Sequence, residues 1–196
     1  MTSYATTLTW RGQSCETLAD ILAPDLVCVF VGLNPSPVSV TAGHYMRGTL
    51  GRQFWSMLDH YGILPLPTDG RLPDEVLLEN GFGFTDLAKC PSPRAISLTR
   101  EDVATGRETL REKVAKYRPR ILCSVYKSTI EALMDKRYRR QYGLLPDRFG
   151  ETMLFAAPFP YKPIEMRDRH FAELCALIEE AGIERSSNFV RGSADA

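Results

Sequence analysis

The sequence lacks the features that mark several large classes of protein. No apolar run among its 196 residues approaches the ~20 residues that cross a bilayer. Residues 1–10 contain no basic stretch followed by an apolar core, so we expect no signal peptide and a cytoplasmic location. The five cysteines form no C-x-x-C pair, which argues against a disulfide scaffold and against a zinc or iron–sulfur site.

The sequence also lacks net charge and several well-known catalytic motifs. The 24 basic residues equal the 24 acidic residues, which excludes a uniformly basic nucleic-acid coat protein but not a local basic face. No P-loop, G-x-G-x-x-G, G-x-S-x-G or H-E-x-x-H motif occurs. These absences argue against a nucleotide hydrolase, a dinucleotide oxidoreductase, a serine hydrolase and a zinc protease.

What the sequence does contain is an alternation of buried strands and helices. Four short apolar runs predict strands, and between and after them lie four helical patterns. The strands are expected at residues 26–31, 82–87, 120–125 and 152–156, and the helices at 52–61, 99–117, 128–134 and 165–181. This order predicts a three-layer α/β/α sandwich with a central, mainly parallel four-stranded sheet. We expect one domain over residues 1–184 and a flexible tail over 185–196.

Three loops rich in proline and glycine follow the first, second and fourth of these strands. They span residues 32–51, 90–98 and 158–163. The carboxyl ends of parallel strands meet at one edge of a sheet, where open α/β folds bind ligands. We therefore expect the three loops to converge on a binding site.

The first loop begins with Gly32, Leu33, Asn34, Pro35 and Ser36. Glycine permits a sharp turn out of the strand, and proline fixes the chain after Asn34. The amide oxygen of Asn34 could hold a water molecule for attack, although it cannot remove a proton as a carboxylate can. The alternative is a local Asn-Pro turn in which Asn34 bonds its own backbone.

Farther along the same loop lie His44 and Tyr45. An aromatic ring beside glycines suits stacking on a flat base, a contact worth roughly 1–3 kcal/mol in nucleic-acid binding. Packing of Tyr45 within its own loop is the alternative. His44 could titrate near neutral pH, but no carboxylate or second histidine lies close to it in sequence.

The second strand carries an acid, Asp86, inside an apolar run. A buried carboxyl group is costly unless it is hydrogen-bonded or functional, so Asp86 is the best candidate for a general base or for an electrostatic role. Pairing with Lys89 or Arg94 is the alternative. Basic side chains near the loops, including Arg47, Arg52, Arg94 and Lys162, could contact phosphates.

These residues together resemble the uracil-DNA glycosylase superfamily, and among its branches most closely the mismatch-specific uracil/thymine branch. Residues 29–36 (VFVGLNPS) are similar to the family's first motif, a strand followed by G-[IL]-N-P-[GS]. Residues 43–45 (GHY) and 51–55 (GRQFW) resemble the pocket loop and the helix that follows it. Residues 81–87 (GFGFTDL) and 117–120 (YRPR) resemble two further strand motifs. The resemblance covers residues 26–181 in this order.

The resemblance implies a three-layer domain that flips a damaged base out of DNA and hydrolyses its glycosidic bond, without a metal or redox cofactor. Asn34 would position the water and Tyr45 would stack on the base. The residues implied to contact the substrate are Gly32, Leu33, Pro35, Ser36, His44, Tyr45, Phe54 and Phe159. Those implied to contact DNA are Arg47, Arg52, Arg94, Tyr161 and Lys162, and a monomer suits such a fold.

Two departures from the family pattern affect the expected mechanism. Where the family has [HN]-P-S as its second motif, this chain has Phe159, so a hydrogen-bond donor to the leaving base is missing. Tyr161 or Lys162 could instead reach a phosphate or fill the gap left by the flipped base. Asp86 stands where the mismatch-specific branch usually has an amide or lysine, so both Asn34 and Asp86 are candidates to activate water.

We therefore predict a monofunctional uracil-DNA glycosylase. The missing donor at Phe159 motivates an alternative, a module of the same fold that binds lesions or abasic sites with little or no cleavage. A small-molecule hydrolase or nucleotide-binding protein is a third possibility, and it predicts no salt-dependent affinity for DNA.

Overall fold

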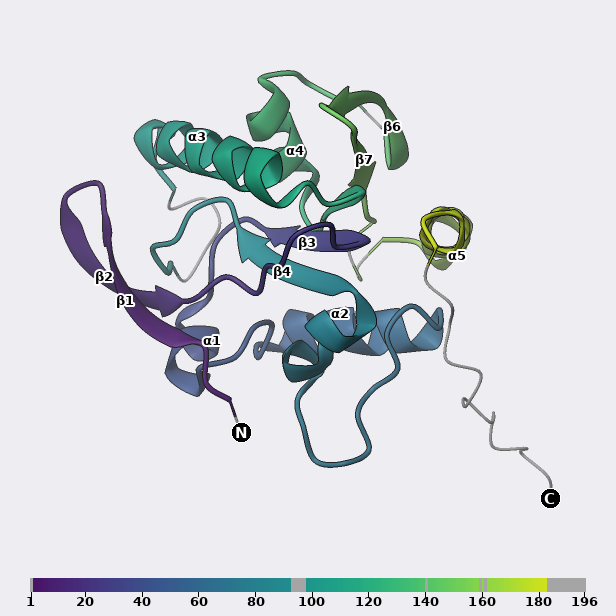
Figure 1. Ribbon diagram of the computed structural model, residues 1–196, viewed down its shortest axis with the longest axis horizontal. Coiled ribbons are helices and arrows are strands. Elements are labelled where there is room, and N and C mark those ends of the chain that lie inside the picture. The colour runs from purple at the N-terminus through teal and green to yellow at the C-terminus, as the bar shows by residue number, and fades with distance from the viewer. Residues whose placement is uncertain (1, 93–97, 140, 159, 161, 183–196) are drawn as a thin grey trace.

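A five-stranded sheet forms the centre of the molecule in the computed structural model, which describes residues 2–92, 98–139, 141–158, 160 and 162–182 (Figure 1). Its strands lie in the order β4-β3-β5-β7-β6. They are β3 (Cys28–Gly32), β4 (Phe82–Asp86), β5 (Ile121–Ser124), β6 (Gly143–Phe149) and β7 (Thr152–Ala156). All neighbouring pairs are parallel except β6 and β7. The prediction of a mainly parallel sheet is confirmed, with one strand more than the four expected.

The unexpected strand β6 lies at the edge of the sheet, where it pairs antiparallel with β7. It contains Pro146, and its pairing shifts register between Leu144 and Arg148. Proline cannot donate to a strand ladder and is therefore confined to edges and irregular positions. Pro146 interrupts the apolar pattern of this segment, so the sequence did not predict a strand there. The same proline explains why the strand is irregular.

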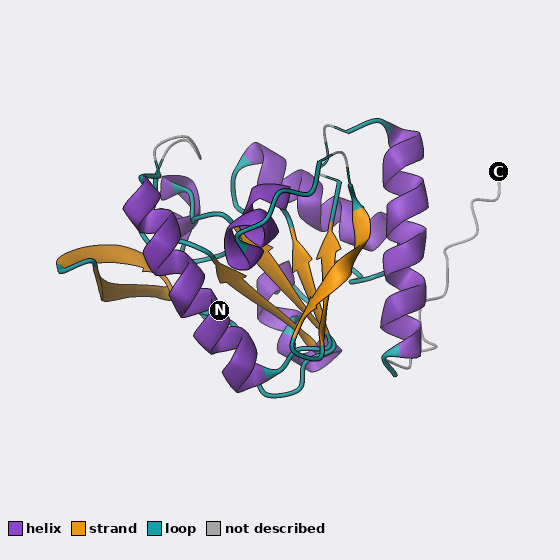
Figure 2. Ribbon diagram, turned by 90° about the horizontal axis from the view of Figure 1, so that it is seen from above, coloured by secondary structure: helices purple, strands orange, loops and turns teal. Residues whose placement is uncertain are grey.

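Helices cover both faces of the sheet (Figures 1 and 2). They are α1 (Pro37–Ala42), α2 (Thr49–His60), α3 (Arg100–Tyr117), α4 (Lys127–Met134) and α5 (Ile164–Glu180), with short 3₁₀ turns at Pro73–Val76 and Leu78–Asn80. Alternate residues of β3 pack against the helices on opposite faces of the sheet, because successive side chains of a strand point to opposite faces. Phe30 packs with Phe54 of α2, whereas Val31 belongs to a second apolar cluster with Leu110 of α3. The three-layer α/β/α arrangement is thus confirmed.

An N-terminal hairpin was not expected from the sequence. It consists of β1 (Ala5–Trp10) and β2 (Gln13–Leu18), paired antiparallel. Arg11 and Gly12 connect them with φ angles of 50° and 77°. Two successive residues with positive φ form the kind of turn that suits the twist of a two-residue hairpin. The segment after β2 then runs along the edge strand β4, where Ile21 pairs with Phe84.

The loop after β3 contains a helix that the sequence analysis treated as loop. Ser36 accepts a hydrogen bond from the Ser39 amide at 3.2 Å, and Pro37 occupies the first helical position of α1. Both are typical helix-start signals. Gly43 ends the helix with φ 70°, a conformation that glycine adopts without strain, and it directs the next residues back toward the sheet.

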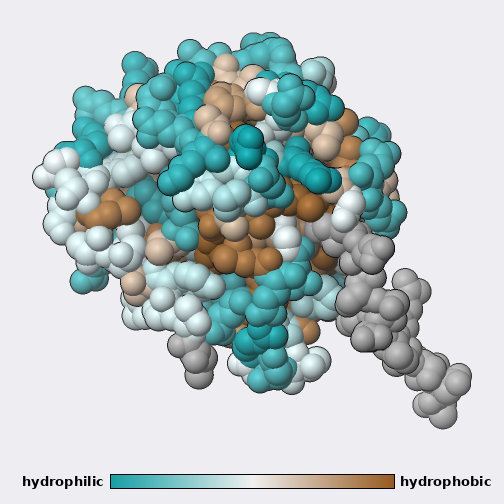
Figure 3. Space-filling view, in the orientation of Figure 1, coloured by the Kyte–Doolittle hydropathy of each residue, from teal (hydrophilic) through white to brown (hydrophobic). Residues whose placement is uncertain are grey.

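The face of the molecule drawn in Figure 3 is mostly hydrophilic, with an apolar band across its centre. Within the described residues, no helix has both the length and the apolar character needed to span a bilayer. The predicted tail at 185–196 lies outside the described residues.

Candidate functional site

A cavity of about 320 Å³ opens at the carboxyl ends of β3 and β4. This volume falls at the lower end of the roughly 300–1,000 Å³ that is usual for small-molecule sites. Its walls come from the loop after β3, the start of α2, the end of β4 and Tyr126, which lies between β5 and α4. Lining residues include Gly32, Leu33, Asn34, Pro35, Ser36, Tyr45, Phe84, Asp86 and Tyr126. The structure therefore brings Asn34, Tyr45 and Asp86 to one cavity.

Asn34 is held by the loop that follows β4. Its Nδ2 donates to the Cys90 carbonyl at 3.2 Å and to Ser92 Oγ at 2.7 Å. A carbonyl can only accept, so these bonds identify the nitrogen and fix the plane of the amide. The two loops are also joined by backbone hydrogen bonds, such as that from the Ala88 amide to the Leu33 carbonyl at 2.9 Å. Asn34 therefore bonds across to a neighbouring loop, which differs from the local turn considered as the alternative.

Every polar group of Tyr45 makes a hydrogen bond within the protein. Its amide donates to Asp74 Oδ2 at 2.7 Å, its carbonyl accepts from Trp55 Nε1 at 3.3 Å, and its hydroxyl donates to the Ala19 carbonyl at 3.0 Å. The ring packs against Phe84, with ring centres 4.5 Å apart and planes inclined by 35°. Burial raises the pKa of the Tyr45 hydroxyl well above its ordinary value, so the residue is neutral. The cavity thus has one rigid aromatic wall.

Asp86 lies at the end of β4 and is only 3% exposed. Within the described part of the chain its Oδ2 has no hydrogen-bond partner. Burial raises the pKa of this carboxyl to about 7, although the positive charges of Lys89 and Lys113 oppose the shift. A carboxyl group with this pKa can exchange a proton at neutral pH, which suits a general acid or base.

The neighbouring strand makes room for this carboxyl group. A Cβ placed on Gly32 would overlap Asp86 Oδ1. Gly32 pairs directly with Asp86 in the parallel register of β3 and β4. The glycine of the first motif is therefore required for the close approach of the acid.

The sequence analysis missed the charged groups behind Asp86. Lys89, considered there as a partner of Asp86, bonds instead to Asp20 Oδ1 at 2.9 Å and to the Tyr45 hydroxyl at 3.3 Å. Lys113 of α3 reaches Asp20 Oδ2 at 2.7 Å. Asp20 and Lys113 lie far from Asp86 along the chain, so no local pattern could have linked them.

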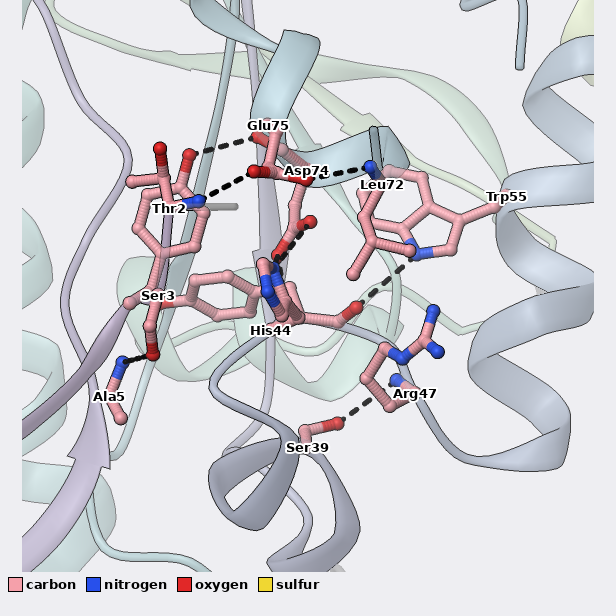
Figure 4. Close-up of polar contacts among 12 residues, drawn as sticks. Thr2, Ser3, Ala5, Ser39, His44, Arg47, Trp55, Leu72, Asp74 and Glu75 are labelled. Carbon is pink, nitrogen blue, oxygen red and sulfur yellow. Dashed lines mark hydrogen bonds and ion pairs between the residues drawn. The ribbon is translucent and has the colours of Figure 1, made fainter. Parts of the chain in front are cut away.

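Two of the expected substrate contacts do not line the cavity. His44 turns away to Asp74, with its Nδ1 3.1 Å from Oδ1 (Figure 4). The carboxylate partner that the local sequence did not supply thus comes from the first 3₁₀ turn. Phe54 is 1% exposed and packs edge-on against Phe30 within the core. Phe159, which was also expected to contact the substrate, lies outside the described residues.

Three of the basic residues expected at DNA lie in described segments near the carboxyl ends of the strands. Arg52 is exposed at the start of α2, and its guanidinium donates to the Arg47 carbonyl at 2.8 Å. The Arg47 amide in turn donates to Ser39 Oγ, as Figure 4 shows. Lys162, after β7, lies 5.5 Å from the centre of the Tyr142 ring. Arg94 and Tyr161 lie outside the described residues.

Comparison with known proteins places the chain among DNA glycosylases of one family. A model of the uracil DNA glycosylase superfamily matches residues 19–176. A G/U mismatch-specific uracil DNA glycosylase from Schizosaccharomyces pombe is 30% identical over 145 residues, which is 67% of this chain and 44% of that protein. The chain thus spans less than half the length of this relative. The matched region begins at residue 19, so the N-terminal hairpin precedes it.

Proposed function

Because the chain belongs to the uracil DNA glycosylase superfamily, we propose that it removes uracil from DNA by hydrolysing the N-glycosidic bond. The observation that carries the proposal is a buried carboxyl oxygen of Asp86 that has no partner among the described residues, in a cavity shared with the Asn34 amide and Tyr45. A carboxyl group without an internal partner favours a catalytic role over a structural one.

In the proposed reaction, water attacks the sugar carbon that carries the base. The Asn34 Oδ1 atom accepts a hydrogen bond from this water, because its Nδ2 is already committed to Cys90 and Ser92. Asp86 takes the proton as the new carbon–oxygen bond forms. The electron pair of the broken carbon–nitrogen bond leaves with the base, which then takes a proton from solvent. Asp86 returns its own proton to solvent and the cycle is complete.

Tyr45 supplies the surface against which the extruded base would lie. Flipping a base costs a few kcal/mol, and least for a mispaired one. A wall that is already rigid requires no further ordering when the base arrives, which favours binding. The bonds from Tyr45 to Asp74, Trp55 and Ala19 support this role.

DNA binding is the second part of the proposal. Arg47 and Arg52 stand beside the segment that forms one wall of the cavity, and Lys162 follows the strand β7. Cations at the carboxyl edge of the sheet could neutralise phosphates on either side of a flipped nucleotide. The proposal that Arg94 and Tyr161 also contact DNA rests on the resemblance alone.

The test is release of base from oligonucleotides that contain uracil opposite guanine, opposite adenine or in single strands. We expect Asp86→Asn and Asn34→Ala each to slow release by at least about tenfold, as loss of general base catalysis or water positioning does. Circular dichroism would show that both variants fold. Wild-type rates in both variants would overturn the proposed mechanism.

Binding measured beside turnover tests the alternative. A chain that binds uracil or abasic DNA in a salt-dependent manner, yet releases no base, is a lesion-binding module. The feature that favours this alternative is Phe159, which cannot donate a hydrogen bond to the leaving base. No salt-dependent affinity for any DNA would exclude both.

A further inference from the structure

Four charged and polar side chains form a closed cluster behind the cavity. Asp20 Oδ1 accepts hydrogen bonds from Thr85 Oγ1 at 2.6 Å and from Lys89 Nζ at 2.9 Å. Its Oδ2 lies 2.7 Å from Lys113 Nζ, which also donates to Thr85 Oγ1 at 3.1 Å. We call Asp20, Thr85, Lys89 and Lys113 the Asp20 cluster.

The position of Asp20 allows the cluster to reach both faces of the sheet. β4 is an edge strand, and the segment after β2 runs alongside it through the pairing of Ile21 with Phe84. Lys113 comes to Asp20 from α3, on one face. Lys89 comes from the loop after β4 and also contacts Tyr45, which packs on the opposite face with Phe84.

The cluster touches the proposed catalytic site through Lys89. Its Nζ lies 3.3 Å from the Tyr45 hydroxyl, and its side chain is 4% exposed. The charge of the cluster is unbalanced, because two ammonium groups face one carboxylate. Ionisation of Asp86 would add a second carboxylate. The two aspartates and the two lysines would then have a net charge of zero. A buried group of charges is most stable when it is balanced.

We propose that the Asp20 cluster sets the protonation state of Asp86, and that Lys89 is the positioning residue that joins it to Tyr45. The proposal rests on the proposed function, because it assumes that Asp86 must be ionised to accept a proton. It assigns roles to Asp20, Lys89 and Lys113 that neither the motifs nor the comparisons assign.

The charges of the Asp20 cluster act on the pKa of Asp86 in opposite directions. The positive charges of Lys89 and Lys113 lower the pKa of Asp86, whereas the negative charge of Asp20 raises it, and burial remains the largest cause. Tyr45 also faces Asp86, but it is neutral because burial raises its own pKa. Loss of either lysine should therefore make Asp86 harder to ionise, and loss of the Asp20 charge should make it easier.

The experiment compares Lys89→Met, Lys113→Met and Asp20→Asn with the wild-type chain. Single-turnover release of uracil is measured from pH 5 to 9, and the wild-type rate should rise with pH through about 7, where Asp86 ionises. We expect both lysine variants to move this rise to higher pH by roughly one unit or more, and Asp20→Asn to move it to lower pH. Lys89→Arg keeps the charge and should restore most of the wild-type profile.

A second readout does not depend on activity. Carbon-13 NMR of labelled aspartate follows the titration of the Asp86 carboxyl group in protein without DNA, with Asp86→Asn identifying its signal. The same opposite shifts are expected there. If the chain releases no uracil but these shifts occur, the proposed function fails and the role of the cluster stands.

Two results would overturn the inference. One is a set of titrations that coincide with the wild type in all three variants. The other is a shift in the same direction for the lysine and the Asp20 variants, which would indicate a general loss of packing. If Lys89→Met does not fold, Lys113→Met and Asp20→Asn still decide the sign, because within the described part of the chain neither Lys113 nor Asp20 is hydrogen-bonded to Tyr45.

Discussion

Two buried aspartates lie near Tyr45, and they differ in how their oxygens are satisfied. Asp74, 1% exposed, accepts from the Tyr45 amide at 2.7 Å and lies 3.1 Å from His44 Nδ1. Asp86, 3% exposed, has an Oδ2 with no partner among the described residues. Burial raises the pKa of both carboxyl groups, but the Tyr45 amide and His44 oppose the shift at Asp74.

The difference indicates separate tasks for two chemically identical groups. A carboxylate whose oxygens accept hydrogen bonds inside the protein contributes to the fold, as Asp74 does by fixing the loop that carries Tyr45. A carboxyl oxygen that is buried without a partner, as Asp86 Oδ2 is among the described residues, weakens the fold and remains available to a substrate or water. Variants of the two residues should therefore have opposite effects on stability.

The largest effect is expected for Asp74→Ala. It leaves the Tyr45 amide and His44 Nδ1 without their acceptor in a buried place, which should lower the free energy of unfolding by about 3–4 kcal/mol. Urea unfolding at pH 8 measures it, and Asp74→Asn, which retains one acceptor oxygen, is the matched control. A loss below about 1 kcal/mol would contradict a structural role for Asp74.

The next effect concerns Asp86→Asn and depends on pH. The pKa of Asp86 is about 7 in the folded protein, above its ordinary value of 3.8, so the folded state binds the proton more tightly. The stability that this proton contributes is complete below about pH 4 and is lost as the pH rises through 7. Wild type should therefore lose roughly 2–3 kcal/mol relative to Asp86→Asn between pH 5 and pH 8.5.

Unfolding curves of both proteins at the two pH values measure this difference. Other groups titrate in the same range, but they are common to both proteins and cancel in the comparison. A constant stability difference between pH 5 and 8.5 would mean that Asp86 is already ionised, or never ionised, across this range.

The contrast between the two aspartates also shows what the sequence could reveal. Asp86 could be identified as a candidate because an acid interrupts an apolar run, and Asn34 because it follows Gly32 at the end of a strand. Both signals are local. The four parallel strands and both helical layers could be predicted for the same reason, since they depend on patterns within single segments.

Contacts between distant segments could not be predicted in this way. Asp74 reaches His44 and Tyr45 across about thirty residues, and Asp20 reaches Thr85 across 65. The hairpin β1–β2 carries a local signal, the Arg11-Gly12 turn after the threonine-rich strand β1, that the sequence analysis did not use. The choice of partner for each buried charge is a property of the tertiary fold.

A smaller effect is expected when the partner of Asp74 is changed and Asp74 is kept. His44→Phe removes one of the contacts to the carboxyl group but leaves the bond from the Tyr45 amide. We expect a loss of about 1–2 kcal/mol, less than for Asp74→Ala. His44→Gln, which can still donate from its amide, is the control for the lost ring. A loss equal to that of Asp74→Ala would mean that His44 accounts for most of the role of Asp74.

The smallest effect is expected for a change at Tyr4, which contacts both Asp74 and His44. Tyr4 donates from its hydroxyl to the Asp74 carbonyl at 3.3 Å, and its ring packs edge-on against His44 at 6.0 Å between ring centres. Tyr4→Phe removes the long hydrogen bond and keeps the ring, so the free energy of unfolding should fall by only about 0.5 kcal/mol. Base release should be unchanged, because the bonds that hold Tyr45 remain. A large loss of activity in Tyr4→Phe would show that the contacts of Tyr4 with Asp74 and His44 affect the cavity as strongly as Asp86 does. The division of tasks between the two aspartates would then no longer hold.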